Sequence, residues 1–343
     1  MRAVVLACVG DVQVEHVADA RVEADTDAVV QVRATAICGA DLFPFHGMTP
    51  GFELGTTMGH EFAGVVVEAG PAVASFQVGD RVACTSTISD GTCAHCRAGR
   101  ASQCLGRSLF GYSGVYPRLE GGQAEYVRVP HAERCLLRLP EEVDDESAIF
   151  LADNLPTGYG AVTRGGVAEG DTVVVVGCGP VGLMAILCAD GLAGTLLAVD
   201  GVPERRRLAE QLGARALAPD EAADAVSQAT DGLGADVVIE AAGSPGALDL
   251  ALRLARGRGT VSVVGAHFEP DYDLDNGLMF EHELTMRFTI GDCARDRWGL
   301  LESIAAGTLD PAQIISHRMP LGDAAEAYRL FDSREATKVV LTP

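Results

Sequence analysis

The chain has 343 residues, of which 48% are hydrophobic, and a formal net charge of −22, so it is long enough for two domains. An acidic surface of this strength repels phosphate backbones and anionic lipids, which excludes nucleic acids and membranes as expected partners. No apolar run reaches the roughly 18 residues of a membrane span, and Asp11 interrupts the N-terminus before a signal-peptide core is complete, so we expect a cytoplasmic protein.

The first 150 residues have the pattern of a β-rich domain. Short alternations of Val and Ala are separated by Gly, Pro and Asp, which is typical of strands joined by turns. Such strands are predicted at 27–37, 62–70, 80–88 and 124–130. The segment 140–166 that follows begins with acidic residues, contains several alanines and is predicted to be helical.

From residue 171 onward, predicted strands and helices alternate. The predicted strands are 171–177, 195–200, 235–243, 259–266 and 283–291, and the predicted helices are 180–191, 203–214, 296–307 and 322–333, followed by a last strand at 336–343. Such an alternation indicates an α/β domain with a doubly wound parallel sheet of the Rossmann type. We therefore predict a β-rich domain over 1–150, a dinucleotide-binding domain over 151–290, and a tail, 291–343, that returns to the first domain.

The stretch VVVVGCGPVG contains the glycine pattern of a dinucleotide-binding loop. Gly177, Gly179 and Gly182 follow a strand of four valines and open a helix, which is the context that this pattern requires. The glycines allow a tight turn, close approach to a pyrophosphate and close helix packing. The predicted cofactor-binding set also includes Pro180, Val181, Arg205 and Gly265.

Asp200 ends the next predicted strand, 23 residues after Gly177. A carboxylate at this place accepts hydrogen bonds from the adenosine ribose and repels a 2′-phosphate, so NAD is favoured over NADP. Three nearby arginines, 205–207, would weaken that preference if they faced the ribose, although a solvated helix face is the simpler interpretation.

Three of the ten cysteines lie close together in the sequence. In a reducing compartment such cysteines are metal ligands more often than disulfides, and Cys93, Cys96 and Cys104 have the spacing of a zinc site. A closed tetrahedral site needs a fourth ligand, for which Asp90 is the best placed and His95 is the alternative. We predict a structural zinc site here.

A second zinc site is predicted from residues that lie far apart in the chain. Cys38, His60 and Asp153 together would hold zinc and leave one position open for a substrate, and Glu61 would serve as a fourth, exchangeable ligand.

The whole chain resembles the medium-chain, zinc-dependent alcohol dehydrogenase family. The matching motifs are CGAD (38–41), GHEFAGVV (59–66), VGDRV (78–82), CAHCRAGRASQC (93–104), DNLPTGY (153–159), GCGPVG (177–182) and GSPGAL (243–248). The stretch around Asp153 is most similar to the formaldehyde-dehydrogenase-like and secondary-alcohol branch, in which an aspartate completes the catalytic zinc site.

The resemblance implies a GroES-like catalytic domain beside the Rossmann domain, and a homodimer or homotetramer paired through the sheet edge at 283–291. It implies that Cys38, His60 and Asp153 are the catalytic zinc ligands, with Glu61 able to join them. It also implies that Cys93, Cys96 and Cys104 are structural ligands. The family usually has cysteine at position 90, so with Asp90 this site is expected either to hold zinc more weakly or to lack it.

Two positions depart from the family's proton path. The family usually has Ser or Thr two residues after the catalytic cysteine and often His five residues after it, where this chain has Ala40 and Phe43. Neither side chain carries a proton, so we expect water, Glu61 or His46 to do so. Phe43, with Phe52, Phe110 and Leu155, predicts an apolar pocket.

Three functions are therefore compatible with the sequence. The favoured one is an NAD-dependent, zinc-dependent interconversion of a small, apolar alcohol with its aldehyde or ketone. The first alternative is a reductase of a conjugated C=C bond or an iminium, whose product needs no protonated oxygen at zinc. The second alternative is a dinucleotide-binding protein without catalysis, which the complete set of zinc ligands disfavours.

Overall fold

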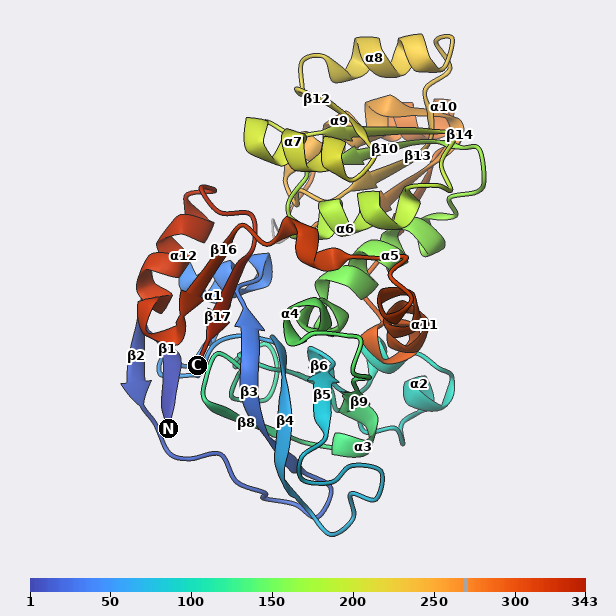
Figure 1. Cartoon of the computed structure of the whole chain (residues 1–343). Helices are drawn as coiled ribbons and strands as arrows, with labels where there is room; N and C mark the ends of the chain where they lie inside the picture. The colour runs from blue at the N-terminus through green and yellow to red at the C-terminus, as the bar shows by residue number, and fades with distance from the viewer. Residues whose placement is uncertain (268–270) are drawn as a thin grey trace. The chain divides into compact units, whose positions relative to one another are not determined.

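The computed structural model describes residues 1–267 and 271–343, which form two compact units (Figure 1). The first unit comprises Met1–Pro156 and Asp292–Pro343, and the second unit comprises Thr157–Gly291. The units divide after Pro156 and after Gly291, slightly beyond the predicted boundaries at 150 and 290. At the first boundary, the first turn of helix α5 (Asn154–Gly165) belongs to the first unit.

A mixed sheet forms the core of the first unit. Its strands lie in the order β16-β17-β3-β4-β5-β9, and β8 also pairs with β3. The strands are β3 (Ala28–Ala36), β4 (Glu61–Ala69), β5 (Arg81–Cys84), β8 (Tyr126–Val129), β9 (Leu136–Arg138), β16 (His317–Pro320) and β17 (Val339–Thr342). All its pairings are antiparallel except that of β16 with β17. The prediction of a β-rich first domain is confirmed.

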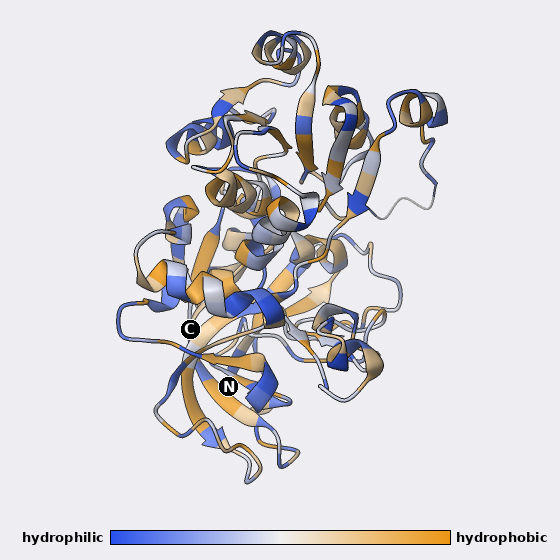
Figure 2. Cartoon of the chain, turned by 90° about the vertical axis from the view of Figure 1, so that its right-hand side faces the viewer, coloured by the Kyte–Doolittle hydropathy of each residue, from blue (hydrophilic) through white to orange (hydrophobic). Residues whose placement is uncertain are grey.

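A hairpin, a short strand pair and several helices complete the first unit. They are the hairpin β1 (Arg2–Cys8) and β2 (Asp11–His16), the pair β6 (Thr87–Ile88) and β7 (Ser108–Leu109), and the helices α1 (Leu42–Phe45), α2 (Ala94–Arg97), α3 (Ala132–Cys135), α4 (Asp145–Ala148), α11 (Cys293–Ala305) and α12 (Ala324–Asp332). Figure 2 shows hydrophobic colour along the strands of the first unit, consistent with the buried side chains of Val30, Val32, Phe62 and Val66 between them.

The second unit contains a six-stranded parallel sheet in the order β12-β11-β10-β13-β14-β15. Its strands are β10 (Thr172–Val176), β11 (Thr195–Val199), β12 (Arg215–Leu217), β13 (Ala235–Glu240), β14 (Ala255–Val263) and β15 (Thr285–Phe288). Its other helices are α6 (Pro180–Ala189), α7 (Pro203–Gln211), α8 (Ala222–Ala229), α9 (Pro245–Leu254) and α10 (Asn276–Glu281). The four consecutive valines of β10 are all buried, as expected for a central strand covered on both faces.

The predicted doubly wound sheet is thus confirmed, since β10 lies at its centre and the chain runs outward from β10 in both directions. Across the described residues, no helix is both long and apolar enough to span a lipid bilayer.

Candidate active site

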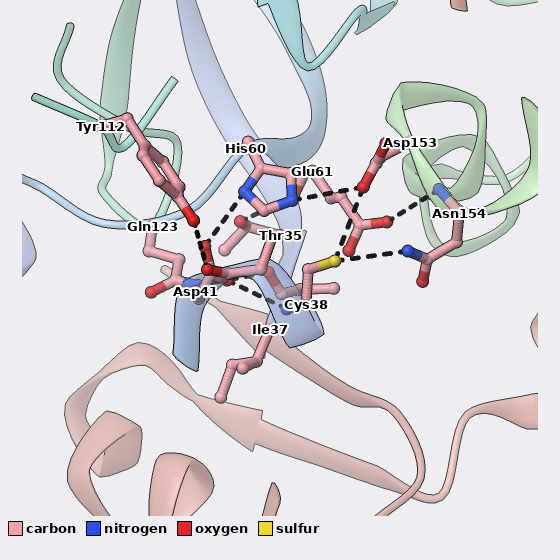
Figure 3. Close-up of polar contacts among 12 residues, drawn as sticks. Thr35, Ile37, Cys38, Asp41, His60, Glu61, Tyr112, Gln123, Asp153 and Asn154 are labelled. Carbon is pink, nitrogen blue, oxygen red and sulfur yellow. Dashed lines mark hydrogen bonds and ion pairs between the residues drawn. The ribbon is translucent and has the colours of Figure 1, made fainter. Parts of the chain in front are cut away.

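Three side chains from separate segments of the first unit meet in one cluster (Figure 3). Cys38 follows the end of β3, and His60 immediately precedes β4. The pairing of Ala36 with Glu61 in these antiparallel strands brings Cys38 and His60 to the same end of the sheet. Asp153 ends a single 3₁₀ turn just before α5 and comes to the same place.

The three potential ligand atoms lie within 4.8 Å of one another. Asp153 Oδ2 is 3.6 Å from Cys38 Sγ and 3.5 Å from His60 Nε2. Cys38 and His60 are buried, whereas the Asp153 side chain is 25% exposed. The cluster therefore has two buried ligands and one that meets solvent, an arrangement that suits a metal with an accessible side.

Asp41 orients the imidazole ring of His60. Asp41 Oδ1 lies 3.0 Å from His60 Nδ1, and Asp41 Oδ2 accepts hydrogen bonds from Cys38 N at 3.0 Å and from Gln123 Nε2 at 3.2 Å. A carboxylate at Nδ1 favours the tautomer that has its proton there, which leaves the lone pair of Nε2 facing the cluster. The CGAD motif contains Asp41, but its spacing alone did not indicate this function.

The electrostatics of the cluster favour a bound cation. Burial, followed by the charge of Glu61, raises the pKa of the Cys38 thiol. Burial disfavours the charged form of His60, but Asp41, Cys38 and Asp153 together raise its pKa well above the usual range. Nε2 of His60 is buried and faces the cluster without a hydrogen bond of normal geometry, since its carboxylate neighbour, Asp153 Oδ2, lies at 3.5 Å. A divalent cation would satisfy this nitrogen and stabilise the thiolate, so the residues fit zinc.

A second cluster in the first unit contains Asp90, Cys93, Cys96 and Cys104, whose ligand atoms also lie within 4.8 Å of one another. Backbone N–H groups at Cys96 and Leu105 are the main groups that lower the pKa of Cys93, to about 7. This favours the thiolate that binds metal. Among the described residues, His95 does not belong to the cluster, so the geometry supports Asp90 over His95 as the fourth ligand.

The carboxylate of Asp90 contacts both its own turn and a cysteine of the cluster. Oδ1 accepts backbone N–H groups from Thr92 at 2.6 Å and Cys93 at 3.1 Å. The side chain of Cys104 also hydrogen-bonds to the Asp90 carboxylate. Oδ1 of Asp90 thus stabilises the turn at Thr92 and Cys93, and the same carboxylate contacts the thiol of Cys104.

Replacing Asp90 by Asn should separate these two functions. The amide oxygen still accepts the N–H groups of the turn, but it is a poor zinc ligand, so we expect release of zinc to a chelator to be at least about tenfold faster. Asp90→Cys, which restores four thiolates, should slow the release. Zinc retention by Asp90→Asn equal to that of the wild type would show that Asp90 is not a ligand.

The predicted dinucleotide loop lies between β10 and α6 in the second unit. Gly177 has φ +97°, and a Cβ there would lie 2.7 Å from the backbone nitrogen of Ala242. A Cβ on Gly182 would lie 1.8 Å from the Gly177 carbonyl oxygen. A Cβ on Gly179 would meet only Arg205 Nη1, at 4.0 Å. Two glycines are therefore required by packing, and the third leaves open space in front of the α6 N-terminus, which is where the sequence predicts a pyrophosphate.

Other predicted cofactor residues gather near this loop. Pro180 and Val181 form the half-buried first turn of α6. Asp200 accepts backbone N–H groups from Cys178 and Val202, each at 2.7 Å, which ties the end of β11 to the loop.

Gly265 follows β14 and approaches the end of β13. A Cβ on Gly265 would lie 2.3 Å from Gly243 N and 2.6 Å from Glu240 Oε2. Glu240 is fully buried, and its Oε2 lies 3.0 Å from His267 Nε2. Gly265 is therefore needed for close packing of two strand ends, in addition to any contact with a cofactor.

Comparison with known proteins identifies the family. Residues 24–141 match the model of the alcohol dehydrogenase GroES-like domain, and residues 180–305 match that of the zinc-binding dehydrogenase domain. The "Zinc-type alcohol dehydrogenase B" of Aspergillus flavus is 36% identical over 99% of this chain and 81% of its own length. The chain belongs to the medium-chain, zinc-dependent alcohol dehydrogenase family.

Solved structures of similar proteins agree with this membership in the zinc-dependent alcohol dehydrogenase family. Alcohol dehydrogenase TADH from Thermus sp. ATN1 has a TM-score of 0.95 and 38% identity, covering 100% of this chain and 99% of that one. A zinc-binding dehydrogenase from Sinorhizobium meliloti 1021 bound to NADP has a TM-score of 0.86 and 30% identity, covering 100% and 99%.

Glu61 differs from what we expected for a member of the alcohol dehydrogenase family. It does not join the metal-type cluster of Cys38, His60 and Asp153 among the described residues. Its Oε2 accepts a hydrogen bond from the buried ammonium of Lys338, and its Oε1 lies 3.4 Å from the donating Asn154 N. Both carboxylate oxygens are therefore held by other partners, so the prediction of Glu61 as a ligand has no support in this arrangement.

His46 is not brought to the cluster of this family member either. Its Nε2 lies 2.7 Å from Asp332 Oδ1 on α12, and its side chain is 44% exposed. The prediction of His46 as a proton carrier depended on its spacing after Phe43, and the contact with Asp332 adds no support to it.

Tyr112 is a neighbour of the alcohol dehydrogenase cluster that the sequence analysis missed. Its hydroxyl donates a hydrogen bond to the Ala40 carbonyl oxygen, and its ring is 7% exposed (Figure 3). Burial is the main cause of a pKa far above the usual range, so this hydroxyl keeps its proton at physiological pH. No motif in the sequence linked position 112 to position 40.

Proposed function

We propose that this family member is an NAD-dependent dehydrogenase that interconverts a small, apolar alcohol with its aldehyde or ketone. The observation that supports this most strongly is the cluster of Cys38, His60 and Asp153, with an unsatisfied His60 Nε2 beside a solvent-accessible carboxylate. The same chain contains a dinucleotide loop with open space at the N-terminus of α6.

The residues of the first unit would hold zinc and orient it. Cys38, His60 and Asp153 are proposed as its ligands, and Asp41 keeps the imidazole in the ligating tautomer. Zinc in such a site polarises an alcohol or carbonyl oxygen, and NAD(H) accepts or supplies the hydride. Asp90, Cys93, Cys96 and Cys104 are proposed as a separate structural zinc site.

The proton needs a path other than the one common in the family. Ala40 and Phe43 offer no proton-carrying group, Glu61 is paired with Lys338, and His46 is paired with Asp332. We therefore propose that water, which has access on the exposed side of Asp153, takes the proton directly. The loss of a positioned acid–base group costs on the order of 10²–10⁴-fold in rate, and water recovers part of that loss.

The preference for a small, apolar substrate rests on fewer residues than expected. Phe110 and Leu155 are fully buried, and Phe110 packs edge-on against Phe62 at 5.1 Å, so these two belong to the core. Phe43 and Phe52 remain half-buried. These two rings, with the methyl group of Ala40, are the proposed apolar wall for the substrate.

NAD is proposed as the preferred cofactor because of Asp200. Asp200 immediately follows β11, and its carboxylate is oriented by the N–H groups of Cys178 in the loop and of Val202, where it would meet the adenosine ribose. The Sinorhizobium meliloti relative bound to NADP shows that the fold also accepts the phosphorylated cofactor. The choice therefore depends on residues such as Asp200 and Arg205 rather than on the fold.

Asp200→Ala should shift the cofactor preference toward NADP. Removing the carboxylate removes its repulsion of a 2′-phosphate, so the ratio of kcat/KM for NAD over NADP is expected to fall by about tenfold or more. Asp220→Ala, at an exposed position of the same unit, is the matched control and should leave the ratio unchanged. A wild-type enzyme that already prefers NADP would contradict the assignment.

One alternative to the dehydrogenase function is supported by a specific observation. A reductase of a conjugated C=C bond or an iminium needs no proton delivered to an oxygen at zinc, which agrees with the absence of proton-carrying groups at Ala40 and Phe43. A non-catalytic dinucleotide-binding protein, by contrast, would have no need for a cluster of three potential zinc ligands.

Deuterium transfer distinguishes these functions. The protein is incubated with 4-deuterated NADH and a mixture of aldehydes, ketones, conjugated enals and cyclic imines, and the products are analysed by mass spectrometry and NMR. We expect deuterium on the former carbonyl carbon. Deuterium on a β-carbon or an iminium carbon would instead establish the reductase, and no transfer to any of them would favour the non-catalytic alternative.

We also propose that the protein forms a homodimer or homotetramer through β15. This strand is the edge of its sheet; its last residue, Phe288, is 69% exposed, and Ile290 just after the strand is 54% exposed. An apolar sheet edge is a common place for pairing with a second copy. Light scattering of Phe288→Glu should show a lower mass than the wild type; an unchanged oligomer would place the interface elsewhere.

A further inference from the structure

Asn154 connects the buried Lys338 to the thiol of Cys38. We propose that Asn154 is a positioning residue, which donates an N–H···S hydrogen bond to the Cys38 thiolate and so lowers the electron density that this ligand gives to the metal. The inference rests on the proposed function, because it requires a metal at Cys38.

The orientation of the Asn154 amide follows from the chemistry of Lys338. An ammonium group has three donors and no acceptor, so the atom of Asn154 that faces it must be the carbonyl oxygen. Lys338 Nζ lies 2.8 Å from Asn154 Oδ1. The NH₂ group is then directed at Cys38, with Nδ2 3.4 Å from Sγ (Figure 3).

Lys338 is itself fixed by three acceptors. It donates to Glu61 Oε2, to Asn154 Oδ1 and to the carbonyl oxygen of Ile37, the last at 3.2 Å. Lys338, Glu61 and Asn154 are each 0% exposed. A flip of the amide would therefore place NH₂ against NH₃⁺ and leave a buried carbonyl oxygen against the sulfur, so a single orientation is held.

A donor aimed at a metal-bound thiolate has a measurable consequence. Hydrogen bonds to an ionised acceptor are stronger than neutral ones, and partners of this kind tune the ligands that they contact. The N–H group stabilises the sulfur lone pairs, so charge transfer from sulfur to a metal requires more energy when the hydrogen bond is present. Without the hydrogen bond, the sulfur-to-metal charge-transfer band moves to longer wavelength.

Cobalt substitution tests this with a spectrum rather than with activity. The sulfur-to-cobalt band of Cys38 is the part of the wild-type spectrum that Cys38→Ser lacks, which separates it from the cluster at Asp90, Cys93, Cys96 and Cys104. Asn154→Leu, which removes the donor but keeps the volume, should move that band to longer wavelength. An unshifted band would overturn the inference.

A matched control changes the neighbourhood of Lys338 but not its ammonium group. Ser316 Oγ hydrogen-bonds to the backbone carbonyl oxygen of Lys338 at 3.1 Å and accepts its backbone N–H at 3.2 Å. Ser316→Ala should therefore leave the band in place. A shift equal to that of Asn154→Leu would show that general loosening moves the band, which would overturn the role assigned to the donor.

If Asn154→Leu does not fold, the hydrogen bond from Asn154 to Cys38 can be tested by NMR of the wild-type protein. The chain has only two asparagines, Asn154 and Asn276, so ¹⁵N-asparagine labelling yields two side-chain NH₂ signals, and exposed Asn276 is an internal control. With ¹¹³Cd in the site, the Asn154 signal should show coupling to cadmium across the hydrogen bond and slow exchange with solvent. Two uncoupled, rapidly exchanging signals would overturn the inference.

The same experiments separate this inference from the proposed function. If wild type and Cys38→Ser have identical cobalt spectra, no metal binds at Cys38 and the proposed active site is wrong. If the Cys38 band is present but Asn154→Leu does not shift it, the metal site stands and only the function of Asn154 is wrong.

Discussion

Cys38→Ser should reduce kcat/KM by at least about 10³-fold, because the loss of the thiolate weakens a metal whose charge stabilisation is worth several kcal/mol. A serine hydroxyl at this place is neutral and cannot replace the charge that a thiolate gives to zinc. The variant should bind one zinc fewer per chain than the wild type. Steady-state kinetics and metal analysis of the same preparation measure both effects.

Cys8→Ser is the matched control for this experiment. Cys8 is exposed at the end of β1 and does not belong to either metal-type cluster of the described residues. Its replacement should change neither turnover nor the zinc content. If Cys38→Ser keeps wild-type turnover, the chemistry does not depend on a metal at this cluster.

Lys338→Met should lower the free energy of unfolding by about 3–5 kcal/mol, the usual cost of breaking a buried ion pair by removing one partner. Lys338 and Glu61 are both fully buried, so the remaining carboxylate has no water to compensate for the lost ammonium. Arg329→Met is the control: Arg329 pairs with Glu326 and Glu335 at the surface, where water replaces the lost partner, so its removal should change stability little.

The instability of Lys338→Met should depend on pH. Burial already raises the pKa of Glu61, and Lys338 opposes that increase, so the pKa rises further in the variant. A carboxyl whose pKa is raised in the folded state destabilises the fold once pH exceeds its unfolded value of about 4.3. The difference in unfolding free energy between wild type and variant should therefore shrink below this pH. Chemical denaturation at several pH values measures it, and a small, pH-independent difference would contradict the assigned pairing.

The sequence was sufficient to predict the features that follow from local patterns. The four valines before Gly177 identified the central strand of the parallel sheet. The short spacing from Cys93 to Cys104 predicted a cluster that the structure brings within 4.8 Å. In both cases the informative residues are neighbours in the chain, so periodicity and spacing contain the information.

Contacts between distant segments could not be predicted in the same way. The partner of Glu61 is Lys338, which immediately precedes β17 and lies 277 residues later in the chain. Lys338 had a signal in the sequence, because it is the only lysine beside 25 arginines and directly precedes an apolar strand. A lone lysine does not indicate which carboxylate pairs with it, and the sequence analysis drew no conclusion from it. Glu61 was therefore predicted as a ligand, whereas the structure shows it held by Lys338.

His46 and Tyr112 show a related limit. His46 was proposed because it lies three residues after Phe43, but the direction of a side chain at the end of α1 depends on what packs nearby, and Asp332 of α12 is within 2.7 Å. Tyr112 reaches Ala40 from a loop 72 residues away. Neither contact leaves a pattern in a single sequence, because each depends on how the whole first unit folds.

Removal and return of zinc tests the central claim most directly. The wild-type protein is stripped of metal with a chelator and titrated with zinc, and reduction of NAD by a small secondary alcohol is measured at each step. The zinc that the wild type binds but Cys38→Ser does not is counted as active-site zinc. We predict that turnover rises in proportion to this zinc. Full turnover before any of it has bound would contradict the account.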